Sequence, residues 1–210
     1  MLGERPLILI ADAAYDTDRV LAALRSVFSS VDGRRLIVLD RAPTFGEVGP
    51  VGARFLRLEA LRALTREAGA ALFVKERADL ALAVGADGLH LGERAIASRD
   101  ARTFGLPLSR ACHDREGLLA AEADLLLLSP VAAPSSKPLV GEALGVEGFG
   151  RLVSGLPRPT PVFALGGVTP ALAGPLRAAG AGGLAVLGGV FGADSPGDAA
   201  SELLAAWDAG

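Results

Sequence analysis

The chain has 210 residues, of which 50% are hydrophobic and only 5% aromatic, and its formal net charge is −3. This length suits one α/β barrel or one doubly wound domain with a sizeable core. No Lys/Arg-rich run is present, which argues against nucleic-acid binding, and a single cysteine excludes a disulfide framework or a thiolate metal cluster. No apolar run is long enough to span a bilayer. We therefore expect a cytoplasmic enzyme with no nucleic-acid and no membrane partner.

Short apolar runs bounded by turns recur along the chain and alternate with helical patterns, which is typical of successive βαβ units. Strands are predicted at residues 7–10, 35–39, 71–74, 88–91, 107–111, 125–128, 161–165 and 183–187. Helices are predicted from Asp16 or Thr17, at 55–68, at 77–84, from Thr169 and at 199–209. A segment at 40–52 is rich in Pro and Gly and is typical of a mobile loop or one that covers a ligand. A second long loop, rich in Pro, Ser and Gly, is predicted at 129–144.

Right-handed crossovers between parallel strands leave few topologies, and eight repeats close naturally into a barrel. The predicted fold is therefore an α/β chain with a (β/α)8 TIM barrel, in a single domain over residues 1–210. The alternative is an open doubly wound sheet. That fold would place its phosphate-binding glycines after the first strand, where this chain reads ADAAYD.

Paired glycines follow two successive predicted strands near the end of the chain. Gly166-Gly167 come after 161–165, and Gly188-Gly189 come after 183–187. Glycine lacks Cβ and tolerates positive φ, so a ligand can approach the backbone closely. Amide N–H groups at such turns bind anions, and barrels usually hold phosphate at the loops after strands seven and eight. The sequence predicts a phosphorylated small-molecule substrate; ordinary turn glycines are the alternative.

A histidine marks the end of the fifth predicted strand, and barrel active sites lie at the C-terminal ends of strands. His113 can take and give a proton near neutral pH, so we predict that it is catalytic; a loop histidine without a role is the alternative. Cys112, its neighbour, points to the opposite face of the strand and is predicted to pack. His90 lies within the fourth strand and is more typical of a hydrogen-bonded core histidine.

Charged and hydroxyl side chains follow three other strands. Lys75 and Glu76 follow the third, and Glu93 follows the fourth. The two glutamates are candidates for a divalent-metal or proton-transfer site, although carboxylates on exposed loops are more often solvated. Ser136 and Lys137 lie in the loop after the sixth strand, where a hydroxyl and an ammonium group can meet phosphate oxygens. A solvated lysine is the alternative there.

Several segments of the chain resemble the thiamine phosphate synthase and TenI superfamily. They are ADLALAVGADGLHLGE, the SP after strand six followed by SSK, ALGGV followed by Thr-Pro, and AGAGGLAVLGGVF. The resemblance implies a (β/α)8 barrel that handles phosphorylated thiazole or pyrimidine precursors of thiamine. It also implies that Gly166, Gly167, Gly188 and Gly189 hold phosphate, and that His113 is the acid/base residue of TenI-type thiazole tautomerases.

The synthases of this superfamily share a Gln-x-Arg-x-Lys segment at strand two that grips pyrophosphate. Matched to it, this chain reads Val38-Leu39-Asp40-Arg41-Ala42, which loses all three side chains and leaves the adjacent Arg41 as partial compensation. The synthase Asn-Asp after strand three, whose Asp holds magnesium, is matched by Lys75-Glu76, and the second magnesium Asp falls at Ala95. The Thr-x-Thr-Lys loop is partly kept as Pro134-Ser135-Ser136-Lys137.

These losses favour a TenI-like thiazole tautomerase, an isomerase that needs one positioned base and no cofactor. It would move a proton on a thiazole carboxylate phosphate so that the ring becomes aromatic. The auxiliary substrate-binding residues would be Lys137, Ser136, Lys75, Glu76 and Arg41. One alternative is a divergent thiamine phosphate synthase, a transferase that uses magnesium to join hydroxymethylpyrimidine diphosphate to thiazole phosphate. A non-catalytic barrel that binds a thiamine precursor is the other alternative, and a homodimer is left open.

Overall fold

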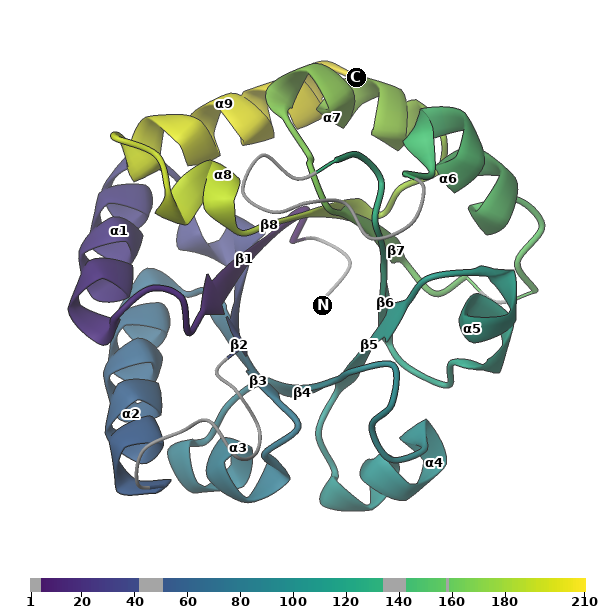
Figure 1. The fold of residues 1–210 in the computed structure, drawn as a ribbon. Helices are drawn as coiled ribbons and strands as arrows, with labels where there is room; N and C mark the ends of the chain where they lie inside the picture. Colours follow the sequence, from purple (N-terminus) through teal and green to yellow (C-terminus); the bar gives the residue numbers. More distant parts are fainter. Residues whose placement is uncertain (1–4, 42–50, 134–142, 158) are drawn as a thin grey trace.

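A closed ring of parallel strands surrounded by helices forms the molecule in the computed structural model (Figure 1). The structure describes residues 5–41, 51–133, 143–157 and 159–210. Within these residues the barrel strands are β1 (Leu7–Asp12), β2 (Leu36–Arg41), β3 (Ala71–Lys75), β4 (Gly88–Leu91), β5 (Leu108–Cys112), β6 (Leu125–Leu128), β7 (Val162–Leu165) and β8 (Gly183–Val186). β1 pairs with both β2 and β8, so the ring is closed. The predicted (β/α)8 barrel is therefore confirmed, and the open sheet is excluded.

Helices follow the strands and cover the outside of the ring (Figure 1). They are α1 (Thr17–Ser30), α2 (Val51–Ala68), α3 (Ala78–Val84), α4 (Ser98–Ala101), α5 (Arg115–Ala120), α6 (Gly145–Val153), α7 (Pro170–Ala178), α8 (Gly188–Phe191) and α9 (Pro196–Ala209), with 3-10 turns at Gly33–Arg35 and Arg102–Phe104. Asp16 caps α1, as predicted, because its carboxylate accepts a hydrogen bond from the Arg19 amide at 2.8 Å. α9 packs beside α1 and α7, which brings the end of the chain back to its beginning.

Side chains alternate strictly between the two faces of each strand, and this alternation creates two cores. The inner core fills the barrel with Ile8, Ile10, Ile37, Leu39, Ala71, Phe73, Leu125, Leu127, Phe163 and Ala185. The outer core joins the intervening strand residues, such as Leu9, Val38 and Val74, to the covering helices. Strands buried on both faces read as continuous apolar runs, which is why their positions could be predicted.

The element boundaries differ from the predicted ones mainly at the rim of the barrel. β1, β2, β3 and β5 each continue for one or two residues past their predicted ends and so include Asp12, Arg41, Lys75 and Cys112. Asp12, Arg41 and Lys75 belong to the strands although they lack the apolar character that marks a buried strand. α2 begins at Val51 rather than at 55, because its first turn carries little sequence signal.

Two strand glycines make room for the aromatic rings of the inner core. A Cβ on Gly88 would overlap the ring of Phe73, and a Cβ on Gly183 would overlap the ring of Phe163. A glycine inside a strand usually weakens it, but here the missing side chain is the space that the neighbouring strand's ring occupies. Packing of the inner core therefore fixes both glycines.

We predict that Gly88→Ala lowers the free energy of unfolding by about 1–3 kcal/mol, because the added methyl group overpacks the barrel interior. Urea denaturation of the variant and of the wild-type protein measures the change. Gly52→Ala is the matched control, since a Cβ there meets no atom within 4 Å. Equal stability of Gly88→Ala and the wild type would contradict this packing.

Candidate active site

A pocket of about 380 Å³ opens at the carboxyl ends of the strands. Its lower wall is apolar and contains Ile10, Leu39, Leu127 and Leu165. The remaining lining includes the polar residues Asp12, Arg41, Lys75, His90, His113 and Ser129. The pocket therefore combines apolar walls with two cationic side chains, an arrangement that suits a ring carrying an anionic group.

The alternation of side chains along β2 shows that the Gln-x-Arg-x-Lys segment of the synthases was matched to this chain one residue out of register. Leu39 lies in the inner core and Arg41 lines the pocket, whereas Val38 lies in the outer core. Asp40 is fully buried on the outer side, against α2. Val38 and Asp40 therefore cannot stand for residues that grip a ligand in the barrel. Leu39 and Arg41 take the inward positions, so the arginine of the pyrophosphate segment has a counterpart in Arg41.

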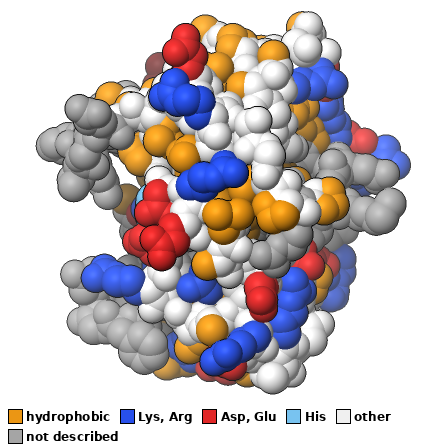
Figure 2. All heavy atoms as spheres, turned by 90° about the vertical axis from the view of Figure 1, so that its right-hand side faces the viewer, with side chains coloured by type: hydrophobic (Ala, Val, Ile, Leu, Met, Phe, Trp, Pro, Cys, Tyr) orange, Lys and Arg blue, Asp and Glu red, His pale blue; other side chains and the backbone are white. Residues whose placement is uncertain are grey.

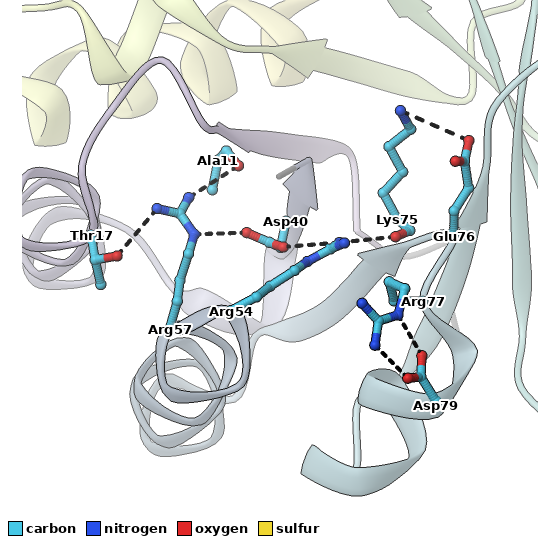
Figure 3. Close-up of polar contacts among 9 residues, drawn as sticks. All are labelled: Ala11, Thr17, Asp40, Arg54, Arg57, Lys75, Glu76, Arg77 and Asp79. Carbon is cyan, nitrogen blue, oxygen red and sulfur yellow. Dashed lines mark hydrogen bonds and ion pairs between the residues drawn. The ribbon is translucent and has the colours of Figure 1, made fainter. Parts of the chain in front are cut away.

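Arg41 and Lys75 approach the pocket from adjacent strands, and each is held by a carboxylate. Arg41 Nε donates to Asp12 Oδ2 at 2.8 Å, and Lys75 Nζ lies 3.8 Å from Glu76 Oε1. Arg41, Lys75 and Glu76 thus lie at neighbouring strand ends (Figure 3 includes Lys75 and Glu76), and their predicted contact with the substrate stays a prediction. Asp12 belongs to this group and orients the Arg41 guanidinium.

Glu76 sits in a strained turn that ties β3 to β4. Its φ is +56°, which is uncommon for a residue with a side chain. The turn is held because the Glu76 amide donates to the His90 carbonyl at 2.9 Å, and Glu76 Oε1 accepts from the Gly92 amide at 3.2 Å. A Cβ on Gly92 would lie 2.5 Å from that carboxylate oxygen. Strain of this kind gathers at ligand sites, and here it places Glu76 beside Lys75.

A buried ionic cluster on the outer side of the rim braces these strands (Figure 3). Arg57 Nε donates to Asp40 Oδ1 at 2.9 Å, and Arg54 Nη2 lies 3.5 Å from Asp40 Oδ2. Arg54 also donates to the Lys75 carbonyl at 2.9 Å, and Arg57 donates to the Ala11 carbonyl at 3.3 Å. The cluster thus connects α2 to the ends of β1, β2 and β3, next to the inward-facing Asp12, Arg41 and Lys75. Burial lowers the pKa of Arg54, while the Asp40 charge raises it.

His113 reaches the pocket with one ring nitrogen fixed by the neighbouring strand end. Its Nδ1 lies 2.8 Å from the Ser129 carbonyl oxygen, which can only accept, so Nδ1 carries the proton. In the neutral ring Nε2 is then the nitrogen without a hydrogen, and it lies 3.9 Å from Glu93 Oε2. This leaves a basic nitrogen at the mouth. Cys112 packs on the outer side, as predicted, and burial raises the pKa of its thiol to about 11.

His90 is buried, as predicted for a core histidine, but its ring also lines the pocket. Nδ1 lies 2.9 Å from the Ser109 hydroxyl. Burial, and then the charges of Lys75, Arg41 and Arg110, lower the pKa of His90 to about 3. The ring is therefore neutral at physiological pH.

The two glycine pairs follow adjacent strands, as predicted, because β7 pairs with β8. Gly166 and Gly167 have φ of +95° and +62°. A Cβ on Gly167 would lie 2.7 Å from the Ala132 carbonyl, so packing on the segment after β6 already requires this glycine. Gly188 and Gly189 begin α8, where first-turn amides lack helical partners. Phosphate binding by these glycines stays a prediction.

Two of the predicted site residues, Ser136 and Lys137, lie outside the residues that the structure describes, as do Pro134 and Ser135. Their proposed contact with substrate phosphate also stays a prediction.

The described part of the chain lacks the two aspartates that the resemblance assigns to magnesium in the synthases. Those residues contain no group of three or more His, Cys, Asp or Glu side chains that could hold a metal. Magnesium can bind through one or two carboxylates and substrate phosphates. However, Glu76 already accepts from Gly92 and faces Lys75, and the second position is Ala95. The residues present do not fit the paired-aspartate site.

A second hollow, of about 490 Å³, lies outside the barrel between the segment after β4 and helix α5. Its lining mixes cations such as Arg99 and Arg110 with anions such as Glu93 and Glu122. Figure 2, which faces this side of the molecule, shows basic, acidic and apolar side chains interspersed over the surface. His113 lines both this hollow and the pocket.

Comparison with known proteins places the chain in a family. The family profile described as thiamine monophosphate synthase (TMP-TENI) matches residues 7–190, so the chain belongs to this family. It is 37% identical over 187 residues to the thiamine-phosphate synthase of Bordetella avium, covering 84% of this chain and 82% of that protein. It is 34% identical over 218 residues to the thiamine-phosphate synthase of Parasynechococcus marenigrum, covering 97% of this chain but only 56% of that longer protein.

Among solved structures, thiamine phosphate pyrophosphorylase from Pyrococcus furiosus superposes with a TM-score of 0.78 at 25% identity, covering 99% of this chain and 98% of that one. The predicted membership of the thiamine phosphate synthase and TenI superfamily is confirmed. The chain is thus a (β/α)8 enzyme of a family named for thiamine biosynthesis. In the described residues, no helix is both long and apolar enough to cross a membrane.

We predict that Asp40→Asn lowers the free energy of unfolding by about 3–5 kcal/mol, because it removes the carboxylate from between two buried guanidinium groups. Chemical denaturation measures the loss. The control is Asp208→Asn, which breaks an exposed pair with Arg35 and should change stability by less than about 1 kcal/mol. Similar losses in the two variants would contradict a bracing role for the buried cluster.

The pKa of His90 predicts a pH dependence of stability. Between pH 6.5 and about 3 the unfolded chain binds a proton on this ring that the folded chain does not. The lowered pKa of His90 therefore reduces the free energy of unfolding as the pH falls below 6.5, by up to about 1.4 kcal/mol per pH unit. Above pH 6.5 no stability is lost through this ring. Denaturation of wild type and His90→Gln across this range should show a steeper loss in the wild type, and parallel curves would contradict a neutral buried His90.

Proposed function

We propose that this chain is a transferase of the thiamine-phosphate synthase type. It would join hydroxymethylpyrimidine diphosphate to a thiazole phosphate and release pyrophosphate. The named relatives favour this reaction over the tautomerase that the sequence suggested. The observation that carries the proposal is the inward orientation of Arg41 beside Lys75 on adjacent strands. The family resemblance assigns this end of strand two to pyrophosphate binding.

The chemistry requires that negative charge be stabilised on the leaving pyrophosphate. The bond between the methylene carbon on the pyrimidine and the diphosphate oxygen breaks, and its electron pair leaves with pyrophosphate. The lone pair of the thiazole ring nitrogen then forms the new bond to that methylene carbon, which leaves the thiazole as a thiazolium. Cationic groups held in place before the reaction favour this charge separation. Arg41 is oriented by Asp12, and Lys75 is held near Glu76 in the strained turn. Both strand ends are braced from outside through Arg54 and Asp40.

The thiazole phosphate would bind on the opposite side of the mouth, at the glycine turns after β7 and β8. First-turn amides at Gly188 and Gly189 offer uncharged donors to its phosphate. Separate anchors for the two anions would hold the thiazole and the pyrimidine carbon together over the apolar wall, and such alignment supplies much of the rate of a two-substrate reaction. Ser136 and Lys137 are proposed as further phosphate contacts.

Thiazole tautomerisation is a second candidate, and the His113 geometry favours it. The Ser129 carbonyl fixes the proton on Nδ1, which leaves Nε2 ready to accept one. A single positioned base supplies roughly 10²–10⁴ in rate, and this reaction would need neither Arg41 nor a metal. The two candidates differ in their substrates and in the residues on which they depend.

The test is an assay of pyrophosphate release from the pyrimidine diphosphate and thiazole phosphate in the presence of magnesium. We predict turnover by the wild type, and a loss of roughly 10²–10³-fold in kcat/KM for Arg41→Ala, because one preorganised donor to the developing charge is removed. Arg34→Ala is the matched control, since Arg34 is exposed before β2 and pairs only with Asp32 among the described side chains.

Other outcomes separate the candidates. Aromatisation of the thiazole carboxylate phosphate that His113→Asn abolishes, with no pyrophosphate release, would establish the tautomerase instead. Binding of either ligand without turnover would favour the non-catalytic barrel.

A further inference from the structure

The charges that line the pocket are opposite to those of a metal site. Among the described lining residues the charged side chains, besides two histidines, are Asp12, Arg41 and Lys75, which makes two cations against one carboxylate. Magnesium sites supply carboxylates, and the bound metal then supplies the positive charge that meets the phosphates. In this pocket the chain itself supplies the excess positive charge. Both cations act on the interior, because they help burial to lower the pKa of His90.

The one carboxylate in this lining is engaged at both oxygens. Asp12 Oδ2 accepts from Arg41 Nε at 2.8 Å, and Asp12 Oδ1 accepts from the Ala14 amide at 2.9 Å. A metal bound to Asp12 would have to take the place of the Arg41 guanidinium. It would also lie near two side-chain cations, and like charges at such distances repel strongly in a partly buried site.

The turn after β3 directs Lys75 and Glu76 differently (Figure 3). Lys75 lines the pocket, whereas Glu76 is not among the lining residues. Glu76 Oε1 instead accepts from the Gly92 amide at 3.2 Å and lies 3.8 Å from Lys75 Nζ. The residue matched to the first magnesium aspartate therefore holds the β3–β4 connection, and the ammonium group beside it faces the ligand space.

The segment after β4, which the resemblance assigns to the second magnesium aspartate, is held by a guanidinium group. Arg110 donates to the carbonyls of Glu93, Ala95 and Ile96 at 3.1, 3.4 and 2.9 Å. Arg110 lines the outer hollow and not the pocket, so these three carbonyls face away from the diphosphate. Position 95 has no donor in its side chain. This segment thus has a fixed conformation that owes nothing to a metal.

We propose that Lys75 takes the place of the magnesium ion in this chain, so that the diphosphate of the substrate binds without a divalent cation. The inference rests on the proposed function and names the charge that neutralises the leaving pyrophosphate. The Lys75 ammonium is a compact positive charge with three donors, and the planar Arg41 guanidinium matches a pair of phosphate oxygens. Glu76 and Asp12 keep the two cations in place.

The test measures binding of inorganic pyrophosphate to the wild-type protein by calorimetry, once with excess magnesium and once with EDTA, both at about 0.15 M salt so that distant charges are screened. Binding in EDTA should be at least as tight as in magnesium, because magnesium in solution competes for the pyrophosphate. Pyrophosphate release from the two substrates should likewise persist in EDTA. Binding that weakens tenfold or more when magnesium is removed would overturn the inference.

Variants at two cations identify the group responsible. Lys75→Met removes the ammonium but keeps an unbranched side chain, and it should weaken pyrophosphate binding in EDTA by roughly 10–100-fold, because a charged hydrogen-bond donor is lost. Lys75→Arg keeps the charge and should recover most of the loss. Arg94→Ala is the control, since Arg94 is exposed after β4 and lines neither cavity; its affinity should stay within about twofold.

An affinity of Lys75→Met equal to that of the wild type, or equal losses in Lys75→Met and Arg94→Ala, would overturn the role of Lys75. Turnover by the wild type with magnesium but none in EDTA would overturn the inference and leave the proposed function intact. A wild type that neither binds pyrophosphate nor releases it under either condition would contradict both.

Discussion

The alternation of side chains along the strands of a closed barrel is the constraint on which the site depends. It sends Arg41 and Lys75 into the pocket and Asp40 outward to α2. It likewise sends Ser109 inward and Cys112 outward on β5. The register of strand two therefore decides whether a cation, Arg41, or a carboxylate, Asp40, faces the pocket. Because both faces of each strand are buried, a slip of one residue would exchange the side chains of the inner and outer cores.

Ion pairs on the outer and inner sides of the barrel rim fix the same strand ends. On the outside, Arg54 and Arg57 draw the ends of β1, β2 and β3 together around Asp40. On the inside, Asp12 and Glu76 hold the two cations that face the pocket. An enzyme that separates charge gains from groups that need not move during the reaction, and the buried cluster gives these side chains a rigid base.

The barrel, the rim position of His113 and the outward packing of Cys112 could be predicted from the sequence, because apolar runs and strand periodicity carry that information. The phase of strand two could not, since VLDR reads equally well with Asp40 or Arg41 inward. The partners of Asp40 lie 14 and 17 residues away on α2, beyond any local pattern. The strained turn at Glu76 and the neutral state of His90 depend on contacts between strands. The register error at Asp40 was one of the losses on which the prediction of a tautomerase rested, together with the two magnesium aspartates that are absent at Glu76 and Ala95.

The most direct measurement is a crystal structure of the protein with hydroxymethylpyrimidine diphosphate bound. We expect the diphosphate on Arg41 and Lys75, at the carboxyl ends of β2 and β3. A diphosphate bound in the hollow beside α5, or at the mouth without contact to either cation, would contradict this assignment of the barrel mouth.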